Sequence, residues 1–463
     1  MAGCSNPPAQ SLLVLKGATV IDVQRGAHLI DATIVIDHDR ITMVGPATDV
    51  RVPRDARVVD VPGKYVIPGL WDVHTHIQNE RELDLFFPLL VAHGVIGIRD
   101  VGGLLPRAFH EFGQQHQYAP HVVACGPIIG DVPDPGAPVD GAIVDELADK
   151  GVDCIKVSSF VSRERFLAIA ARARARGLDV VGHVPVAVSA TEASDAGLRT
   201  MEHLDEMLLN ASLNEAELRA TRVRTLNRLR DPELMLMWTW PPIEPFLSRW
   251  SDDKAAALFA TLVKNGSWQT PTLEDFHVWW VSTADDQAYW NDPNLRFIPK
   301  DWLDGWHHEH NAFLSSLSLS ELAALVQRMK AWYESELMVT KRMRAAGIQF
   351  LAGTDVSQWN HMVAGASLHD ELERMVEAGL TPLDALRAAT INPAMYLRIE
   401  STAGTIAVGK RADVVILDAD PTKRISNSRK ISAVVLGGRL IDRSALDALL
   451  QSAGSRAAQI QPR

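Results

Sequence analysis

The chain has 463 residues, of which 47% are hydrophobic and 22% charged, a composition typical of ordinary globular proteins. It contains 46 Lys and Arg against 57 Asp and Glu, so its formal net charge is −11. This acidic balance argues against a nucleic-acid partner, which would require a basic face to neutralise phosphates. No apolar run in the sequence reaches the length needed to span a membrane.

The three cysteines carry two predictions. Ala2-Gly3-Cys4 resembles the end of a bacterial lipoprotein signal, which would place a lipid anchor at Cys4 and the protein in the periplasm or on a membrane. The alternative is a chance sequence in a disordered N-terminus, residues 1–11, of a cytoplasmic protein. Cys125 and Cys154 lie in apolar stretches and are interpreted as small buried residues, so a disulfide framework is not expected.

The two ends of the chain have the same character. Residues 12–67 alternate β-branched runs with Gly, Pro and Asp breaks, as in "LLVLKGATVID" and "ATIVIDHDRITMVG". Residues 400–445 repeat this pattern in "GTIAVGKRADVVILDADP" and "ISAVVLGGRLID". We therefore expect one small β-sandwich domain assembled from both ends, followed by a C-terminal tail at 446–463.

The middle of the chain, residues 68–399, alternates strand-like and helical segments. The apolar run "DCIKVSSF" precedes the helical "SRERFLAIAARARARG", and "DVVGHVP" precedes "SATEASDAG". Strands that alternate with helices of this length predict parallel βαβ units and an α/β fold. The length of the segment fits eight such units closing into a TIM barrel.

Tryptophan is concentrated in one part of this segment. All but Trp71 of the twelve tryptophans lie between Trp238 and Trp359. One interpretation is that these rings pack long inserted helices onto the barrel. The other is that some of them form walls of a substrate pocket, because inserted βα loops lie at the catalytic face of a barrel.

The sharpest local motif is "VIPGLWDVHTHI". On a strand, residues two apart project to the same face, so His74 and His76 would point at one spot. In a barrel that spot is the open end at its centre. A His-x-His pair alone also arises by chance, and the decision depends on further residues.

Four further residues with metal-ligating or charged side chains follow apolar runs. Taken singly, each would be interpreted as a satisfied core residue or a salt-bridged lysine. Ligand-type residues at five strand ends, where barrel enzymes place their chemistry, instead predict a metal site. The four residues are Lys156 in "CIKVSS", His183 in "GHV", His203 in "MEHLDE" and Asp355 in "LAGTDV".

These motifs together resemble the amidohydrolase superfamily, in the branch of imidazolonepropionase-like and Xaa-Pro dipeptidase-like (prolidase-type) hydrolases. The resemblance extends over almost the whole chain, from "GKYVIPGLWDVHTHI" through "WQTPTL" to "SLHDELERMVEAGLTPLDALRAATINPA" and "GTIAVGKRADVVILDADP". The fold it implies is a distorted (β/α)8 barrel beside a small β-sandwich.

The resemblance also implies a role for each strand-end residue. Lys156 would be carboxylated by carbon dioxide, and the carbamate would bridge two metal ions. Asp355 would shuttle the proton. Some relatives carry another histidine two residues after the one matching His183, where this chain has Pro185, so their substrates do not transfer. His74 and His76, with Asp355, would bind the more buried metal, and His183 and His203 the second.

The chemistry follows from the ligand types. Imidazole and carboxylate donors suit Zn²⁺ and, less often, Mn²⁺ or Fe²⁺. Two such ions would hold a hydroxide and polarise a carbonyl, while Asp355 accepts the proton and returns it to the leaving amine. The sequence therefore predicts hydrolysis of an amide or peptide-like C–N bond in a small molecule, such as a dipeptide, an N-acyl amino acid or an aryl amide.

Several alternatives stay open from the sequence. The enzyme would instead open a cyclic amide or lactone, as imidazolonepropionase-type relatives do, or the barrel would be a scaffold without catalysis. His361 and His369 are the remaining candidate site residues. His369 either faces the pocket or lies on a helix surface or an interface, and a homo-oligomer is compatible with the sequence.

Overall fold

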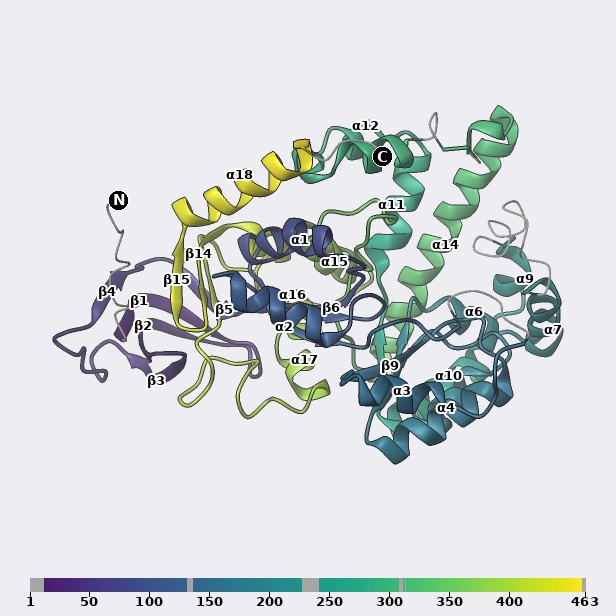
Figure 1. The fold of residues 1–463 in the computed structure, drawn as a ribbon, viewed down its shortest axis with the longest axis horizontal. Helices are drawn as coiled ribbons and strands as arrows, with labels where there is room; N and C mark the ends of the chain where they lie inside the picture. Colours follow the sequence, from purple (N-terminus) through teal and green to yellow (C-terminus); the bar gives the residue numbers. More distant parts are fainter. Residues whose placement is uncertain (1–11, 131–135, 227–240, 308–310, 313, 460–463) are drawn as a thin grey trace.

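The computed structural model describes residues 12–130, 136–226, 241–307, 311–312 and 314–459, and shows an α/β fold (Figure 1). The sequence around Cys4, with its predicted lipid anchor, lies outside the described residues. Purple strands from the N-terminus and yellow strands from the C-terminus share one sheet, and the rest of the chain extends away from it. None of the helices in the described ranges is long and apolar enough to cross a membrane.

The two chain ends form a single sheet, as the shared sequence character predicts. Its strand order is β15-β14-β13-β5-β1-β2-β3, and β4 pairs with β1. All strands are hydrogen-bonded into this one sheet, rather than two, because the long strand β1 pairs with β4 near its start and with β5 near its end. The strands are β1 (Leu12–Asp22), β2 (Ala27–Asp37), β3 (Arg40–Pro46), β4 (Arg57–Asp60), β5 (Tyr65–Pro68), β13 (Val414–Leu417), β14 (Ile431–Leu436) and β15 (Arg439–Asp442).

The alternation of side chains across this sheet explains how it is attached. In β13, Val414 and Ile416 belong to the sheet's own apolar core, whereas Val415 and Leu417 belong to the main core of the molecule. Successive residues of a strand point to opposite faces, so one strand serves both cores. The small sheet is thereby fixed rigidly against the part of the molecule that carries the predicted metal ligands.

The middle of the chain contains two parallel sheets, ordered β6-β7-β8 and β12-β11-β10-β9. Apart from β8, which is mostly half-buried, these strands are buried along almost their whole length, as expected of parallel strands covered on both faces. Three further parallel bridges join Ile129 to Val157, Gln269 to Phe350 and Thr75 to Val356. The strands are β6 (Leu70–Thr75), β7 (Val95–Asp100), β8 (His121–Ala124), β9 (Cys154–Val157), β10 (Asp179–Gly182), β11 (Leu198–Glu202) and β12 (Trp268–Thr270).

Helices follow these strands in turn, and their ends carry ordinary capping residues. For example, the Ser162 side chain accepts a hydrogen bond at the start of α4, and Gly177 ends that helix in a left-handed conformation. The helices up to the insertion are α1 (Glu80–Ala92), α2 (Pro106–Gln115), α3 (Ile143–Asp149), α4 (Arg163–Arg176), α5 (Ala190–Ala196), α6 (Asp205–Ala211) and α7 (Glu215–Leu226).

The tryptophan-rich segment is a helical insertion, and its described rings mainly pack. Trp306 donates to the carbonyl oxygen of Gln358 at 3.0 Å, and Trp332 donates to that of Pro241 at 2.8 Å. The packing interpretation therefore holds for these two residues. The helices are α9 (Glu244–Leu247), α10 (Asp252–Asn265), α11 (Leu273–Thr283), α12 (Gln287–Trp290), η1 (Pro293–Phe297), α13 (Lys300–Trp306), η2 (Leu314–Ser316) and α14 (Leu319–Ala345).

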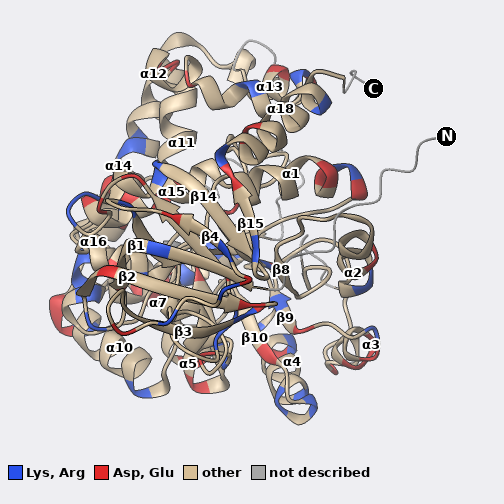
Figure 2. Cartoon of the chain, turned by 90° about the vertical axis from the view of Figure 1, so that its left-hand side faces the viewer, with Lys and Arg blue, Asp and Glu red and all other residues tan. Residues whose placement is uncertain are grey.

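The C-terminal part of the chain ends in a long helix that packs against α1 and η1. Residues 446–459, expected as a tail, belong to helix α18, which packs against α1 through an ion pair between Arg456 and Asp84. Figure 2 shows basic and acidic residues interspersed around the outside of the molecule; Arg176 of α4, for instance, pairs with Asp145 of α3. The last helices are α15 (Ala366–Glu377), α16 (Pro382–Ala388), α17 (Ile391–Tyr396), η3 (Ile425–Arg429) and α18 (Arg443–Gln459).

Cys125 and Cys154 are buried, as predicted, but the expectation that they form no disulfide is wrong, because the two are joined in one. Cys125 follows β8 and Cys154 begins β9, and the backbone N–H of Asp153 donates to the carbonyl oxygen of Ala124 at 2.9 Å. This pairing brings the two Cα atoms to 4.4 Å, within the range that a disulfide spans. A separation of 29 residues gave no local signal of the contact.

Candidate metal centre

The structure brings the six predicted ligands together at the carboxyl ends of the parallel strands. Asp355 Oδ1 lies 3.1 Å from His74 Nε2 and 2.9 Å from His76 Nε2. The Nζ atom of Lys156 is 3.3 Å from His74 Nε2. The ring centroid of His203 lies 4.8 Å from that of His74 and 4.7 Å from that of His183.

Each residue owes its position to a strand. His74 lies in β6 and Lys156 in β9, while His183 and His203 directly follow β10 and β11. Asp355 ends an extended segment that lies beside β6, and its backbone N–H donates to the carbonyl oxygen of His74 at 2.8 Å. In parallel strands the carboxyl ends meet on one side, which is why these residues converge.

The four histidines share one arrangement: the Nδ1 atom of each ring is held by a neighbouring oxygen. Such contacts fix the orientation and tautomer of a metal-binding imidazole. They leave the Nε2 atoms turned toward the centre. The partners are Glu202 Oε2 for His74 (2.8 Å), the Gly102 carbonyl for His76 (3.1 Å), Ser159 Oγ for His183 (2.7 Å) and Thr272 Oγ1 for His203 (2.8 Å).

The backbone has unusual conformations at three positions of the centre. His203 and Asp355 have φ angles of 68° and 69°, a left-handed conformation that is unusual for residues other than glycine and that collects at functional sites. Gly182, before His183, has φ +126°, and a Cβ atom there would lie 2.2 Å from the Val157 carbonyl oxygen. Only glycine therefore allows β10 to pass this close to β9.

The sequence reasoning missed Glu202 and Arg99, which support His74 from behind. Glu202 accepts from Arg99 Nη2 at 2.8 Å through one oxygen and contacts His74 Nδ1 through the other. Burial opposes ionisation, but the Arg99 guanidinium and His74 hold the pKa of Glu202 well below its usual range. Both are fully buried charged residues in apolar strands, a signal that the sequence does contain.

Asp355 is also positioned by its surroundings. Asn360 Nδ2 donates to Asp355 Oδ2 at 2.6 Å and to its carbonyl oxygen at 2.9 Å. Burial opposes ionisation of Asp355, yet electrostatic interactions with His74 and His203 and hydrogen bonds with His74 and His76 hold its pKa well below the usual range. A carboxylate that is ionised and held in one orientation is suited to bind a metal ion or to accept a proton.

The protonation states of His183 and His203 also fit metal binding. Burial lowers the pKa of His203 to about 3 and lowers that of His183 well below its ordinary value. Both rings are therefore neutral at physiological pH, which is the form that binds a metal.

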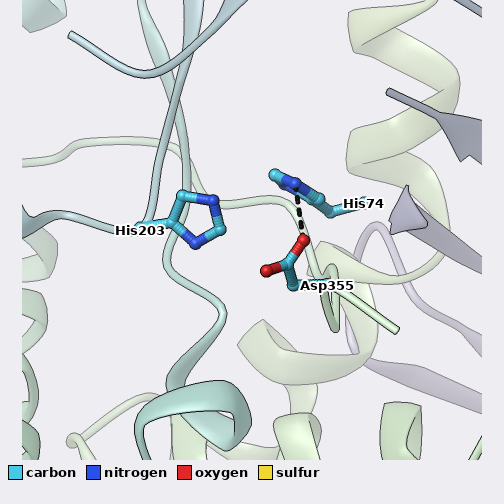
Figure 3. A group of neighbouring side chains, drawn as sticks. All are labelled: His74, His203 and Asp355. Carbon is cyan, nitrogen blue, oxygen red and sulfur yellow. Dashed lines mark ion pairs between the residues drawn. The ribbon is translucent and has the colours of Figure 1, made fainter. Parts of the chain in front are cut away.

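The donor set fits a divalent transition metal ion. His74, His203 and Asp355 each offer one ligand atom, and these atoms lie within 4.8 Å of one another. Figure 3 shows the three side chains converging from separate strands, with the ion pair between His74 and Asp355 marked. Neutral imidazoles with a carboxylate are the donors that Zn²⁺ prefers in hydrolytic sites.

His361 and His369 are not part of this centre. His369 is buried, contacting Ser428 Oγ at 2.8 Å and the His93 carbonyl oxygen at 3.0 Å, so it neither faces a pocket nor lies on a helix surface. His361 contacts Ser282 Oγ at 2.7 Å, and its ring lies against Trp279.

Comparisons with known proteins agree with the motifs. Residues 307–441 match the model of the amidohydrolase family. Adenine deaminase 3 of Rhizobium meliloti is 22% identical over 416 residues, 87% of this chain and 54% of the relative. An imidazolonepropionase of Rhizobium rhizogenes is 45% identical over 62 residues, 13% of this chain and 15% of the relative.

The fold has solved counterparts. A Xaa-Pro dipeptidase structure with bound methionine in the active site superposes with a TM-score of 0.62 at 18% identity, covering 93% of this chain and all of that chain. The likeness shows a shared fold. The chain spans about half the length of the curated adenine deaminases it matches, 54% in the case of adenine deaminase 3. The family match over residues 307–441, the shared fold and the short segment similar to imidazolonepropionase confirm the resemblance found in the motifs.

Proposed function

We propose that the protein is a metal-dependent hydrolase that cleaves an amide or peptide-like C–N bond. The observation that carries this proposal is the shared anchoring of the four histidines, each held through Nδ1 with its Nε2 atom turned to one centre. A scaffold without catalysis has no need of four oriented imidazoles around a carboxylate. The match of residues 307–441 to the amidohydrolase family supports the reaction class.

We assign a separate role in metal binding or proton transfer to each of the six residues. His74, His76 and Asp355 would hold one metal ion, His183 and His203 a second, and Lys156 would bridge them. Divalent ions at this position, zinc by the donor types, would activate water and polarise the scissile carbonyl. Asp355, ionised and held by Asn360, would accept the proton from water and pass it to the leaving amine.

Lys156 fits this scheme when it is carboxylated. Its amine would add to carbon dioxide and release a proton, giving a carbamate with two oxygen donors. Lys156 is fully buried and 3.3 Å from His74 Nε2, where a positive charge beside metal ions would be unfavourable. The carbamate replaces this cation by an anionic ligand.

We also propose that the two parallel sheets and the segment 350–356 form one distorted (β/α)8 barrel. The Ile129–Val157 bridge links the segment after β8 to β9, and the other two bridges place residues 350–356 between β12 and β6. Backbone hydrogen bonds support this segment as the eighth strand, with Leu351 N–H donating to the Gln269 carbonyl oxygen at 2.8 Å. The metal centre would then lie at the open end of the barrel.

The substrate class is narrowed by a direct test. Zinc- or manganese-loaded protein would be screened against dipeptides, N-acyl amino acids and aryl amides. A cyclic amide and a lactone would test the ring-opening alternative, and adenine would test the deamination named for the relative that matches 87% of this chain. Release of an amine from a linear amide supports the proposal, whereas cleavage of only the cyclic compounds or adenine would replace its substrate class.

The role of Lys156 gives a sharper prediction. Lys156→Ala should fold, lose nearly all activity and bind less metal, because the bridging carbamate is missing. Acetate or propionate would enter the cavity left by the side chain and restore part of both properties. Activity and bound metal would be measured against acid concentration at constant ionic strength. A stable variant with wild-type turnover would refute the role of Lys156.

The location of the protein is a separate proposal. We propose that it is exported and anchored through Cys4. The disulfide between Cys125 and Cys154 supports this proposal, because disulfides persist mainly in oxidising compartments. Cell fractionation and mass spectrometry of the native protein would test it, and recovery from the cytoplasm without a lipid at Cys4 would count against it.

A further inference from the structure

Helix α11, which begins just after the loop that supports His203, presents two faces. Its N-cap residue Thr272 holds His203 Nδ1 through Oγ1 at 2.8 Å. One face of α11, including Glu274 and Val278, lines an outer cavity of about 430 Å³ together with α12 and α15. Asp275 and Trp279 lie about 100° or more around the helix from Glu274 and do not line this cavity.

Asp275 has an unsatisfied oxygen at this second face. Its Oδ1 atom is buried and has no hydrogen-bond partner among the described residues. The indole of Trp279, one turn further along α11, donates to its carboxylate. The Trp279 ring in turn lies 4.4 Å, centroid to centroid, from the ring of His361, in the loop that follows Asp355. The side chain is thus positioned by its own helix and by that loop.

The electrostatic surroundings of Asp275 are negative. Burial is the main cause that raises the pKa of Asp275 well above its ordinary value, and repulsion from Asp355 is the next. Glu371 and Glu274 act in the same direction. Asp275 is therefore a neighbour of the proposed catalytic carboxylate. A buried carboxylate oxygen without a partner is costly, and such groups in native proteins call for a ligand or a functional explanation.

We propose that Asp275 is a specificity-determining residue that receives the ammonium group of a substrate bound at the metal centre. An ammonium group satisfies the open oxygen with a charge-assisted hydrogen bond and offsets the local negative charge. This inference rests on the proposed function and narrows it: dipeptides and aminoacyl amides with a free α-amino group are bound, and N-acylated compounds are disfavoured.

The test compares two probes that differ only at the amine. Leucine hydroxamate and N-acetyl-leucine hydroxamate both bind zinc through the hydroxamate group, and their affinities for the zinc-loaded protein would be measured by calorimetry. Wild type should prefer the free amine by about 10- to 100-fold, the range of a hydrogen bond between charged groups. Asp275→Asn should reduce this preference to about twofold and leave the affinity for the N-acetyl probe unchanged.

A matched control is Asp286→Asn. Asp286 lines the outer cavity and caps α12 by accepting from the N–H of Ala288 at 2.7 Å, a role that Asn retains. This variant makes the same Asp-to-Asn change in the same insertion, and it should keep the wild-type preference.

Each outcome has a defined meaning. Equal binding of the two probes to wild type, or equal weakening of both in Asp275→Asn, would overturn the role of Asp275 while binding of the N-acetyl probe still supports the metal centre. Failure of both probes to bind zinc-loaded wild type would overturn the proposed function and this inference with it. A retained preference in Asp275→Asn, with the thermal stability of wild type, would also reject the inference.

Discussion

The small sheet and the strand-end centre are equally well buried but chemically opposite. Leu15 and Ile34 in the sheet and His74 and Lys156 at the strand ends are all fully buried. In the sheet, burial removes apolar surface from water and stabilises the fold by about 25 cal/mol per Å². At the strand ends, burial of ionisable groups costs free energy unless partners compensate. The sheet therefore serves stability, and the strand ends hold the groups proposed to bind metal and substrate, at the expense of stability.

The largest expected effect concerns metal content and activity at the strand ends. His74→Ala and His183→Ala should each lose metal and reduce activity by about 1,000-fold or more, beyond the 10- to 100-fold typical of residues behind a metal ligand. Folding should be retained, because each change removes a group whose burial costs free energy. Elemental analysis, with bicarbonate and zinc or manganese present, should give one to two ions per wild-type chain. Equal metal in all three proteins would contradict the assignment.

The converse effect is expected in the small sheet. Ile34→Ala in β2 should lower the free energy of unfolding by about 2–5 kcal/mol, because it removes a fully buried side chain and leaves a cavity. Metal content and activity per folded molecule should remain those of wild type. Chemical denaturation and elemental analysis on the same samples would measure both. A loss of metal from the folded variant would show that the two regions are coupled.

Glu202 lies between these extremes, since it is buried and charged but is not a proposed ligand. Glu202→Gln should weaken metal affinity by about 10- to 100-fold, because it weakens the support of His74 Nδ1 and leaves Arg99 without its anion. The matched control is Glu371→Gln. Burial raises the pKa of Glu371 to about 8, so this carboxyl is already neutral at pH 7 and the change should have little effect there.

Competition between metal and chelator would measure the affinity of each variant. Equal losses in Glu202→Gln and Glu371→Gln would mean that Glu202 acts only through packing. A normal affinity in Glu202→Gln would show that the orientation of His74 does not depend on the carboxylate.

The sequence predicts which residues lie at strand ends better than it predicts which residues pair across the fold. The strand-end positions of His74 and Asp355 follow from local patterns, because apolar runs end in polar residues there. Glu202 stands beside His203 in the sequence, but its role depends on Arg99, 103 residues away, and no local pattern contains that pairing. The predicted ligand roles remain predictions until metal is measured.

Contacts between distant segments explain the failures as well. The disulfide between Cys125 and Cys154 exists because the end of β8 and the start of β9 lie side by side, and that adjacency arises from how the two parallel sheets meet. His369 was expected to face the pocket or to lie on a helix surface or at an interface, and it is buried where η3 covers α15 at Ser428. Helix periodicity shows which residues share a face and does not show what covers that face.

The smallest expected effect is on the pH dependence of stability, and it concerns His361, a buried histidine outside the metal centre. Burial lowers the pKa of His361 to about 3, against about 6.5 for an exposed histidine. Between these values the unfolded chain binds a proton that the folded chain does not, so stability falls as the pH drops below about 6.5. At pH 5 this loss amounts to at most about 2 kcal/mol relative to pH 8.

His361→Asn keeps a polar partner for Ser282 and lacks the titrating ring, so its unfolding free energy should fall less between pH 8 and pH 5. Urea denaturation of both proteins at the two pH values would measure the difference. Identical pH dependence in both proteins would show that His361 binds its proton equally well in the folded and unfolded chains, so that burial does not exclude the charge.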